Sequence, residues 1–250
     1  MFHLLAFGGA ALDASAGDVQ LPAVADQQYT RSNNNFQLPV SHQLYWGYSG
    51  GTGLTRARIQ TGSLRSKGLP QIFPVFGATV PPSPHNVFDM RENPIMLRAE
   101  EDLRIDVTDA AANPVVTLLA VSPFTLNRNI NTRDLRIIRF TATSVLAELA
   151  WAAPVSLTFQ DTLEGGNYSV FGMYTQGANL IASRLIFPNN NALRPGSLGE
   201  AAVTNVINTE VAFGGMGKWG EFTTYAQPQL ECLGNTAGSQ AIEGRLLVGK

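Results

Sequence analysis

The chain has 250 residues, and its 17 basic and 19 acidic side chains give a net charge of −2 at pH 7. Charged residues make up 14% of the sequence, below the roughly 25% of an ordinary soluble domain, and no basic stripe supports nucleic-acid binding. The single cysteine, Cys232, excludes an intrachain disulfide and a cysteine-based zinc site, and no apolar run reaches the roughly 18 residues of a transmembrane helix.

Residues 1–20 differ in character from the rest of the chain. The stretch from Phe2 to Leu12 is apolar, and an Ala-Ser-Ala sequence at 14–16 could pass for a signal-peptidase site. However, no Lys or Arg precedes the apolar stretch, and two glycines at 8–9 interrupt it. We therefore expect an N-terminal arm that packs on a neighbouring molecule or tucks under the fold.

Strand patterns dominate from residue 38 onward. Residues 103–108 alternate apolar and polar side chains, as a half-buried strand does, and residues 115–121 form a continuous apolar run typical of a strand buried on both faces. Turn formers separate further strands, which are predicted at 38–48, 54–60, 71–76, 135–143, 154–160, 168–175, 180–187, 219–225, 229–233 and 242–248.

Helical patterns are few and short. Only Thr143–Ala152 and Ser197–Ile207 look helical, and the 24 glycines and 14 prolines exclude long helices. The chain is therefore predicted to be all-β, as a sandwich or barrel of many short strands. A break near residues 142–154 indicates one β-sandwich over 21–145 and a second over 146–250. Short sequence echoes between these halves occur in opposite order, so they support an internal repeat only weakly.

The sequence FGGMGKWG at residues 213–220 contains the Gly-x-Gly-x-x-Gly spacing of a dinucleotide-binding loop. That site needs a helix after the glycines and an acidic residue about 20 positions further on. Residues 219–225 instead have the pattern of a strand, and no acidic residue stands about 20 positions after Gly215. The glycines are therefore expected to form a tight turn with positive φ, which leads into a strand that packs Trp219 into a β-sandwich.

No catalytic constellation stands out. His85, Asp89 and Glu92 form only a loose metal-ligand pattern on a proline-rich loop. The acidic residues at 100–102 are expected to form a charged turn, because adjacent strand residues point to opposite faces. Cys232 lies in a strand pattern with no histidine nearby in sequence and is expected to be a small buried residue. We expect no enzymatic activity, no cofactor and no bound metal.

One basic cluster and two asparagine runs are candidates for binding. Arg56 and Arg58 share one face of a predicted strand, with Arg65 and Lys67 close by in sequence. They could meet nucleic acid, lipid head groups or carboxylates, and interface contact or internal ion pairing is the favoured interpretation.

The asparagine runs at 33–35 and 189–191 could hydrogen-bond sugars. A sugar site also needs an aromatic ring for stacking, and Phe36 and Phe187 are the adjacent candidates.

Several short motifs together resemble a known group of capsid proteins. They are Leu54-Thr-Arg-Ala-Arg-Ile59 with Ser63-Leu-Arg65, Asn93-Pro-Ile-Met-Leu97 followed by Glu101-x-Leu103, and Leu193-Arg-Pro-Gly-Ser-Leu-Gly199 followed by Gly217-x-Trp219-Gly-x-Phe222. This pattern is diffuse and covers residues 40–235. It is similar to the double jelly-roll major capsid proteins of tailless icosahedral bacteriophages that enclose a lipid membrane. The resemblance implies two tandem jelly rolls, with a single jelly roll carrying long insertions as the alternative.

The resemblance also implies a function, a location and partners. We expect a major capsid protein of the virion, which self-assembles as trimeric pseudo-hexagonal capsomers into an icosahedral shell. Its partners would be further copies of itself, minor capsid or vertex proteins, and an internal lipid membrane. The arm residues expected to face the membrane or a neighbour are Phe2, Leu4, Leu5 and Phe7. The subunit-contact candidates are Arg56, Arg58, Arg65, Asn189, Asn190, Asn191 and Arg194.

Two other functions remain open at the level of sequence. One is a carbohydrate- or receptor-binding β-sandwich, such as a spike or adhesin, which would show an exposed aromatic platform beside the asparagine-rich loops. The other is an enzyme on a jelly-roll scaffold, in which His42 or His85 would meet carboxylates in a pocket.

Overall fold

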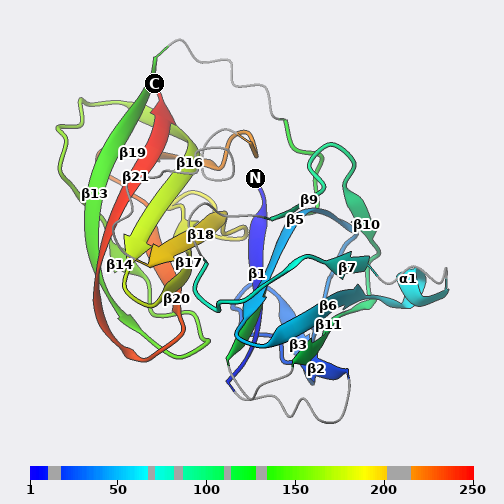
Figure 1. Ribbon diagram of the computed structural model, residues 1–250. Helices are drawn as coiled ribbons and strands as arrows, with labels where there is room; N and C mark the ends of the chain where they lie inside the picture. The colour runs from blue at the N-terminus through cyan, green and yellow to red at the C-terminus, as the bar shows by residue number, and fades with distance from the viewer. Residues whose placement is uncertain (11–17, 67–70, 82–86, 110–113, 128–133, 202–214) are drawn as a thin grey trace. The chain divides into compact units, whose positions relative to one another are not determined.

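Strands account for nearly all of the regular structure (Figure 1). The computed structural model describes residues 1–10, 18–66, 71–81, 87–109, 114–127, 134–201 and 215–250. Within these ranges the only helix is α1, Gly62–Ser66, and no helix is long and apolar enough to cross a membrane. The all-β prediction is confirmed, and the curled sheets agree with the β-sandwich class.

The chain divides into two compact units. Unit 1 comprises Met1–Leu4, Pro81–His85 and Thr125–Lys250, and unit 2 comprises Leu5–Val80 and Asn86–Phe124. The main boundary therefore lies between Phe124 and Thr125, whereas the sequence suggested 145/146. The physical reason is β13, Leu135–Leu146, which forms an antiparallel ladder along its whole length with β21, Gly238–Gly249, and so belongs with the C-terminal strands.

Unit 2 is a β-sandwich whose two sheets each have six strands among the described residues. One sheet has the order β1-β12-β5-β10, with β8 and β9 also paired to β5, and the other has the order β3-β4-β11-β6-β7, with β2 also paired to β11. The strands are β1 His3–Gly9, which belongs to this unit from Leu5 onward, β2 Val19–Leu21, β3 Thr30–Ser32, β4 Asn35–Gln37, β5 His42–Gly51, β6 Leu54–Gln60, β7 Gln71–Phe73, β8 Val75–Phe76, β9 Phe88–Asp89, β10 Ile95–Leu97, β11 Asp102–Asp109 and β12 Val115–Ser122.

The core of unit 2 follows from the periodicity of its strands. Leu103, Ile105 and Val107 of β11 enter one hydrophobic core with side chains from the facing sheet, such as Leu119 of β12. All eight residues of β12 are buried, as its continuous apolar run predicts. Burial of apolar surface, at about 25 cal/mol per Å², is thus the main stabilising term in this unit.

Unit 1 is organised around one sheet, which has nine strands among the described residues. Its order is β14-β20-β17-β18-β16-β21-β13-β15, with β19 also paired to β16. The remaining strands are β14 Val155–Ser156, β15 Thr158–Phe159, β16 Asn167–Gly177, β17 Leu180–Ile186, β18 Gly196–Ala201, β19 Gly220–Thr223 and β20 Gln229–Gly234. Trp151, which follows β13, forms an antiparallel bridge with Leu233 of β20. β20 lies near one end of the strand order and β13 near the other. Because the bridge joins the segment after β13 to β20, the sheet curls back on itself.

The helix prediction for residues 143–152 is wrong, and that for 197–207 is wrong where the structure describes it. Residues 143–146 complete β13, with Ser144 and Leu146 buried and Val145 exposed between them. Residues 147–151 form only isolated bridges and a turn. Residues 196–201 form β18, and residues 202–207 lie outside the described ranges. Conversely, α1 was not predicted; its first turn is capped by the Thr61 hydroxyl, which accepts the Leu64 backbone N–H at 3.2 Å.

The N-terminal segment is a buried strand, so the expected outward-facing arm is corrected. The four residues Phe2, Leu4, Leu5 and Phe7 are all fully buried in the folded chain. The Phe2 ring packs edge-on against Trp219 at 5.2 Å in unit 1, and the Phe7 ring packs edge-on against Phe36 at 5.1 Å in unit 2. These side chains therefore have no surface left to offer a membrane or a neighbour, and the alternative that the segment tucks under the fold agrees with the structure.

The glycine-rich loop has the structure expected of a turn where the structure describes it, from Gly215 onward. Gly217 has φ 68°, a conformation that favours glycine. Trp219 is buried, and β19 follows and pairs with β16. Because a strand and not a helix follows the glycines, no helix N-terminus is available there to bind a pyrophosphate.

Replacing Gly244 by alanine is expected to destabilise unit 1. A Cβ atom at this position of β21 would lie 2.1 Å from Cζ of Phe140 on the paired strand β13, so the buried ring must move, at a cost of about 1–3 kcal/mol. Gly165→Ala is the matched control, because nothing lies within 4 Å of a Cβ there. Thermal unfolding of both variants checks this; equal melting temperatures would contradict the tight packing of Phe140 over Gly244.

Candidate functional site

The arginine cluster lies on the polar face of the sheet that contains β2, β11 and β6. The strand register pairs Val107 with Val19 on one side of β11 and Thr108 with Arg56 on the other. Residues directly opposite one another point to the same face, so Asp18, Thr108 and Arg56 form a polar row across the three strands. Arg58 lies two residues further along β6 on the same face, as the alternation at residues 54–60 predicts.

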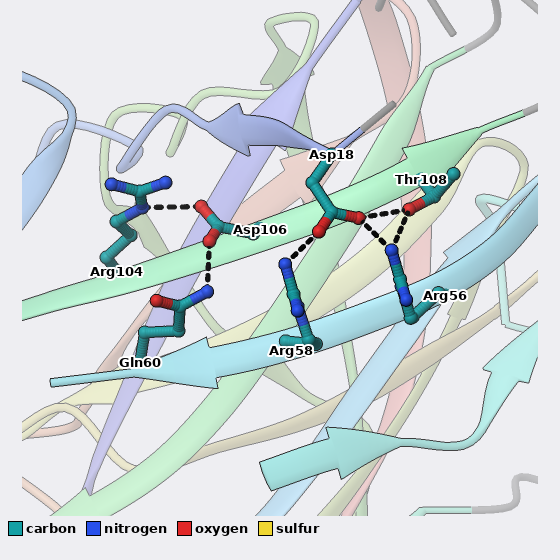
Figure 2. A network of polar contacts seen from close by, with 7 residues as sticks. All are labelled: Asp18, Arg56, Arg58, Gln60, Arg104, Asp106 and Thr108. Atoms are coloured by element: carbon teal, nitrogen blue, oxygen red, sulfur yellow. Dashed lines mark hydrogen bonds and ion pairs between the residues drawn. The ribbon is translucent and has the colours of Figure 1, made fainter. Parts of the chain in front are cut away.

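Asp18 joins the two arginines into one network, as Figure 2 shows. Its carboxylate forms ion pairs with both Arg56 and Arg58 and accepts the Thr108 hydroxyl at 2.5 Å. The Arg56 guanidinium also donates to the Thr108 hydroxyl at 3.3 Å. The two guanidiniums are thus paired within the chain, which agrees with the internal ion pairing that the sequence left open beside interface contact.

A second carboxylate on this face was missed at the level of sequence. Asp106 is 1% exposed although it lies on the polar side of β11. Arg104 donates to it from Nε at 2.5 Å, and the Gln60 amide donates to its other oxygen. Buried charge is tolerated only with such partners. The Arg-x-Asp spacing on one strand face was the available signal, but only the pairing of β11 with β6 brings Gln60 to it.

Arg65 stands apart from this network, at the end of α1. Its side chain has no ion-pair partner within the described ranges, and it lines a hollow of about 290 Å³ together with Asn35, Glu101 and Arg104. Glu101 accepts hydrogen bonds from the Ser63 backbone N–H and hydroxyl at 3.1 and 2.8 Å. Burial acts to raise the pKa of Glu101, but these hydrogen bonds and the charge of Arg98 hold the pKa below its usual value. The hollow therefore carries charges of both signs.

Arg194 lies in a buried charge cluster of unit 1, so it is not available as a contact residue. One oxygen of the Glu231 carboxylate accepts from Arg184 Nε and the other from Arg194 Nη1, both at 2.6 Å. All three side chains are at most 3% exposed. The Arg184 guanidinium also lies 4.0 Å from the centre of the Trp151 ring, whose π face attracts a cation.

His3 ties the N-terminus to this cluster. Its Nδ1 accepts the Arg194 backbone N–H at 3.0 Å, and Arg184 Nη1 lies 3.3 Å from its Nε2 and donates to the Leu4 carbonyl at 3.2 Å. No local pattern in the sequence signals this cluster, because its members are far apart along the chain.

The asparagine run at 189–191 is exposed and follows directly on β17. Asn190 is held by the turn, since its side-chain oxygen accepts the Ala192 N–H at 3.2 Å. The aromatic neighbours proposed for sugar stacking, Phe36 and Phe187, are both buried. The expected pairing of asparagine runs with these two rings is therefore corrected: neither ring has a face open to a ligand.

His42 lies among uncharged partners. Its Nδ1 is 2.6 Å from the Val40 carbonyl, and its Nε2 is 2.8 Å from the Tyr29 hydroxyl. The carbonyl can only accept, so Nδ1 carries the proton and Nε2 accepts from Tyr29. Burial lowers the pKa of His42, and the Val40 carbonyl opposes this only in part.

The stability of the protein is expected to fall at acidic pH in a way that depends on His42. Because its pKa is lower in the folded chain than the value of about 6.5 in an unfolded one, the unfolded state binds the proton first. Neutral His42 therefore makes its full contribution to the free energy of unfolding above pH 6.5. This contribution is lost as the pH falls through the pKa of His42 in the folded chain. Urea unfolding from pH 8 to 5 checks this: the stability advantage of the wild type over His42→Gln should shrink toward pH 5. A constant difference would contradict the lowered pKa.

Other candidates for chemistry lie apart from these groups. Cys232 is buried, and burial raises its pKa to about 12, so the thiol is protonated at neutral pH and is a poor nucleophile. His85, from the loose metal-ligand pattern, lies outside the described residues. Elsewhere in the described chain, no three His, Cys, Asp or Glu side chains gather as a metal site.

Comparison of the chain with protein-family models, with curated proteins and with solved structures gives no match in any of the three. Its function therefore has to be inferred from the arrangement of its own residues.

Proposed function

We propose that the chain is a virion structural protein, the major capsid protein of a tailless icosahedral bacteriophage. Its two β units would be the two jelly rolls of a double jelly roll, and three chains would form a pseudo-hexagonal capsomer. The observation that carries the proposal is the set of apolar side chains left exposed on β13.

The outward face of β13 carries apolar residues near both of its ends. Val145 is 70% exposed, and Leu135 and Ile137 are also exposed. Val145 lies eight positions after Ile137, which is about 27 Å along a strand. Their cross-strand neighbours on β21 are Leu247 and Ser239. Arg139, Thr141 and Thr143 lie between Ile137 and Val145 on the same face, and we infer that this mixed polar and apolar face meets another copy of the chain.

Unit 2 has three exposed apolar side chains near one end of β5. Met96 lies opposite Gln43 in the β10–β5 ladder, and the Tyr45 hydroxyl donates to the Phe124 carbonyl at 3.3 Å. Val40, whose carbonyl accepts from His42, is the third, and Val40, Met96 and Phe124 are all more than half exposed. We infer that each unit contacts neighbouring copies through its own exposed apolar side chains.

The electrostatics also favour close packing of many copies. Only 14% of the residues are charged, and Arg56 and Arg58 are neutralised in part by Asp18 of the same chain. A surface with little net charge lets identical subunits approach without strong repulsion.

Lysine substitutions on β13 test the proposal. The double variant Ile137→Lys, Val145→Lys places charge at both apolar ends of this face without disturbing buried groups and should shift the protein from assemblies toward a 26.9 kDa monomer. Thr236→Lys, at an exposed turn between β20 and β21, is the matched control and should assemble like the wild type. Light scattering measures the mass of each. Unchanged assembly of the double variant would overturn the role of β13.

A further inference from the structure

Unit 1 contains a hollow of about 470 Å³ beside the turn between β19 and β20. The strand register builds its floor: Gln229 of β20 lies opposite Ser156 of β14 on one side and opposite Ile186 of β17 on the other. Directly opposed residues share a face, so these three side chains form one row. Pro188, just after β17, and Tyr225, in the turn, form part of the wall.

Tyr225 lies at the tip of the turn from Thr223 to Ala226. Thr223 and Ala226 exchange backbone hydrogen bonds of 3.3 and 3.2 Å, and the Thr223 hydroxyl accepts the Ala226 N–H at 3.1 Å. Thr224 and Tyr225 are therefore held at the tip. The Tyr225 side chain is 97% exposed and makes no ring contact or hydrogen bond with another described residue. The turn thus holds the backbone of Tyr225, and its aromatic face is open to solvent.

The lining of the hollow indicates a neutral, hydroxyl-rich ligand. None of the described side chains that line it is charged, whereas two other hollows, beside Arg65 and beside Arg139, are lined by arginines and glutamates. Its polar groups are amides and hydroxyls, from Gln227, Gln229, Thr224 and Ser156. The Gln227 amide already donates to the Thr224 carbonyl at 3.4 Å, which orients its oxygen as an acceptor.

These groups match the chemistry of a sugar ring. Amides and hydroxyls both donate and accept, as adjacent sugar hydroxyls require. The face of an aromatic ring is electron-rich and attracts the axial C–H groups of a pyranose. The size of the hollow lies within the range of small-ligand sites, about 300–1,000 Å³.

We propose that this hollow is a binding site for neutral carbohydrate, with one pyranose ring stacked on Tyr225 and its hydroxyls bonded to Gln227 and Gln229. Such a site would give the chain a recognition function in addition to assembly. Tyr225 takes over the stacking role for which Phe36 and Phe187 are too deeply buried.

The test is a glycan microarray with neutral, sialylated and sulfated oligosaccharides, followed by calorimetric titration of the neutral glycan that binds best. Tyr225→Ala should weaken binding at least about tenfold, which corresponds to about 1.4 kcal/mol. Tyr225→Trp, which keeps an aromatic face, should retain binding, and Gln229→Ala should reduce it. Because Tyr225 is exposed, its variants should fold as the wild type does. Thr236→Ala changes an exposed turn residue of unit 1 that does not line the hollow, and it serves as the control that leaves binding unchanged.

Several results would overturn this proposal. They are the absence of binding to every neutral glycan, a preference for acidic glycans, and unchanged binding by Tyr225→Ala. Loss of assembly by Tyr225→Ala without any glycan binding would show instead that a second copy fills the hollow. The titration can be made on monomer or assembly, so its outcome is independent of the capsid proposal.

Discussion

Replacing Glu231 by alanine is expected to lower the free energy of unfolding by about 3–5 kcal/mol, the usual effect of removing one partner from a buried ion pair. Glu231 is the carboxylate that pairs with both Arg184 and Arg194. Its loss leaves two buried guanidiniums without their shared carboxylate, although Arg184 still lies over the Trp151 ring and donates to the Leu4 carbonyl. Urea unfolding followed by tryptophan fluorescence measures the loss, because Trp151 lies in the cluster.

The matched control for this substitution is Glu221→Ala. Glu221 also pairs with a basic residue, Lys218, but both side chains are about half exposed, and exposed pairs contribute at most about 1 kcal/mol. If Glu231→Ala and Glu221→Ala were equally mild, the buried cluster would not be a main stabilising feature of unit 1.

Replacing Phe7 by alanine is expected to cost about 3–5 kcal/mol, as is usual for a fully buried phenylalanine. Phe7 is in the centre of β1, packs against Phe36 and belongs to the core of unit 2. The substitution leaves a cavity there, and the mostly β-sheet surroundings can relax only in part. Denaturant unfolding with circular dichroism in the far ultraviolet checks the expected loss.

This prediction also separates the two readings of the N-terminal segment. Phe124→Ala removes the same side chain at a position that is 64% exposed, so it should leave stability nearly unchanged. An outward-facing arm would make the two substitutions equally mild in the isolated protein. A buried strand makes Phe7→Ala far more damaging, and only that result agrees with the structure.

Much of the fold could be predicted because the burial of a strand determines the local pattern of apolar and polar residues in its sequence. The alternation at residues 103–108 and the apolar run at 115–121 correspond directly to β11 and β12. The turn at Gly217 and the burial of Trp219 were predicted from residue chemistry alone. By contrast, β1 was missed because its residues are apolar on both faces and end in two glycines, so no period distinguishes a strand from an arm.

The polar sites were harder to predict because their partners come together only through register. The face shared by Arg56 and Arg58 was predicted, but Asp18 is 38 residues from Arg56 and reaches it only because β2 and β6 flank β11. Residues 143–152 show a second limit of prediction from sequence, the choice between helix and strand. A short apolar run with alanines fits a helix or a strand equally well, and the ladder with β21 decides for the strand.

The most direct test of the proposed function is the mass of the wild-type protein in solution, measured by light scattering over a wide concentration range, with electron microscopy of the same fractions. A capsid protein of this kind should form a trimer of about 80 kDa from chains of 26.9 kDa, and the trimers should tile into pseudo-hexagonal arrays or closed shells. A monomer at every concentration, with no arrays in the images, would contradict the proposal.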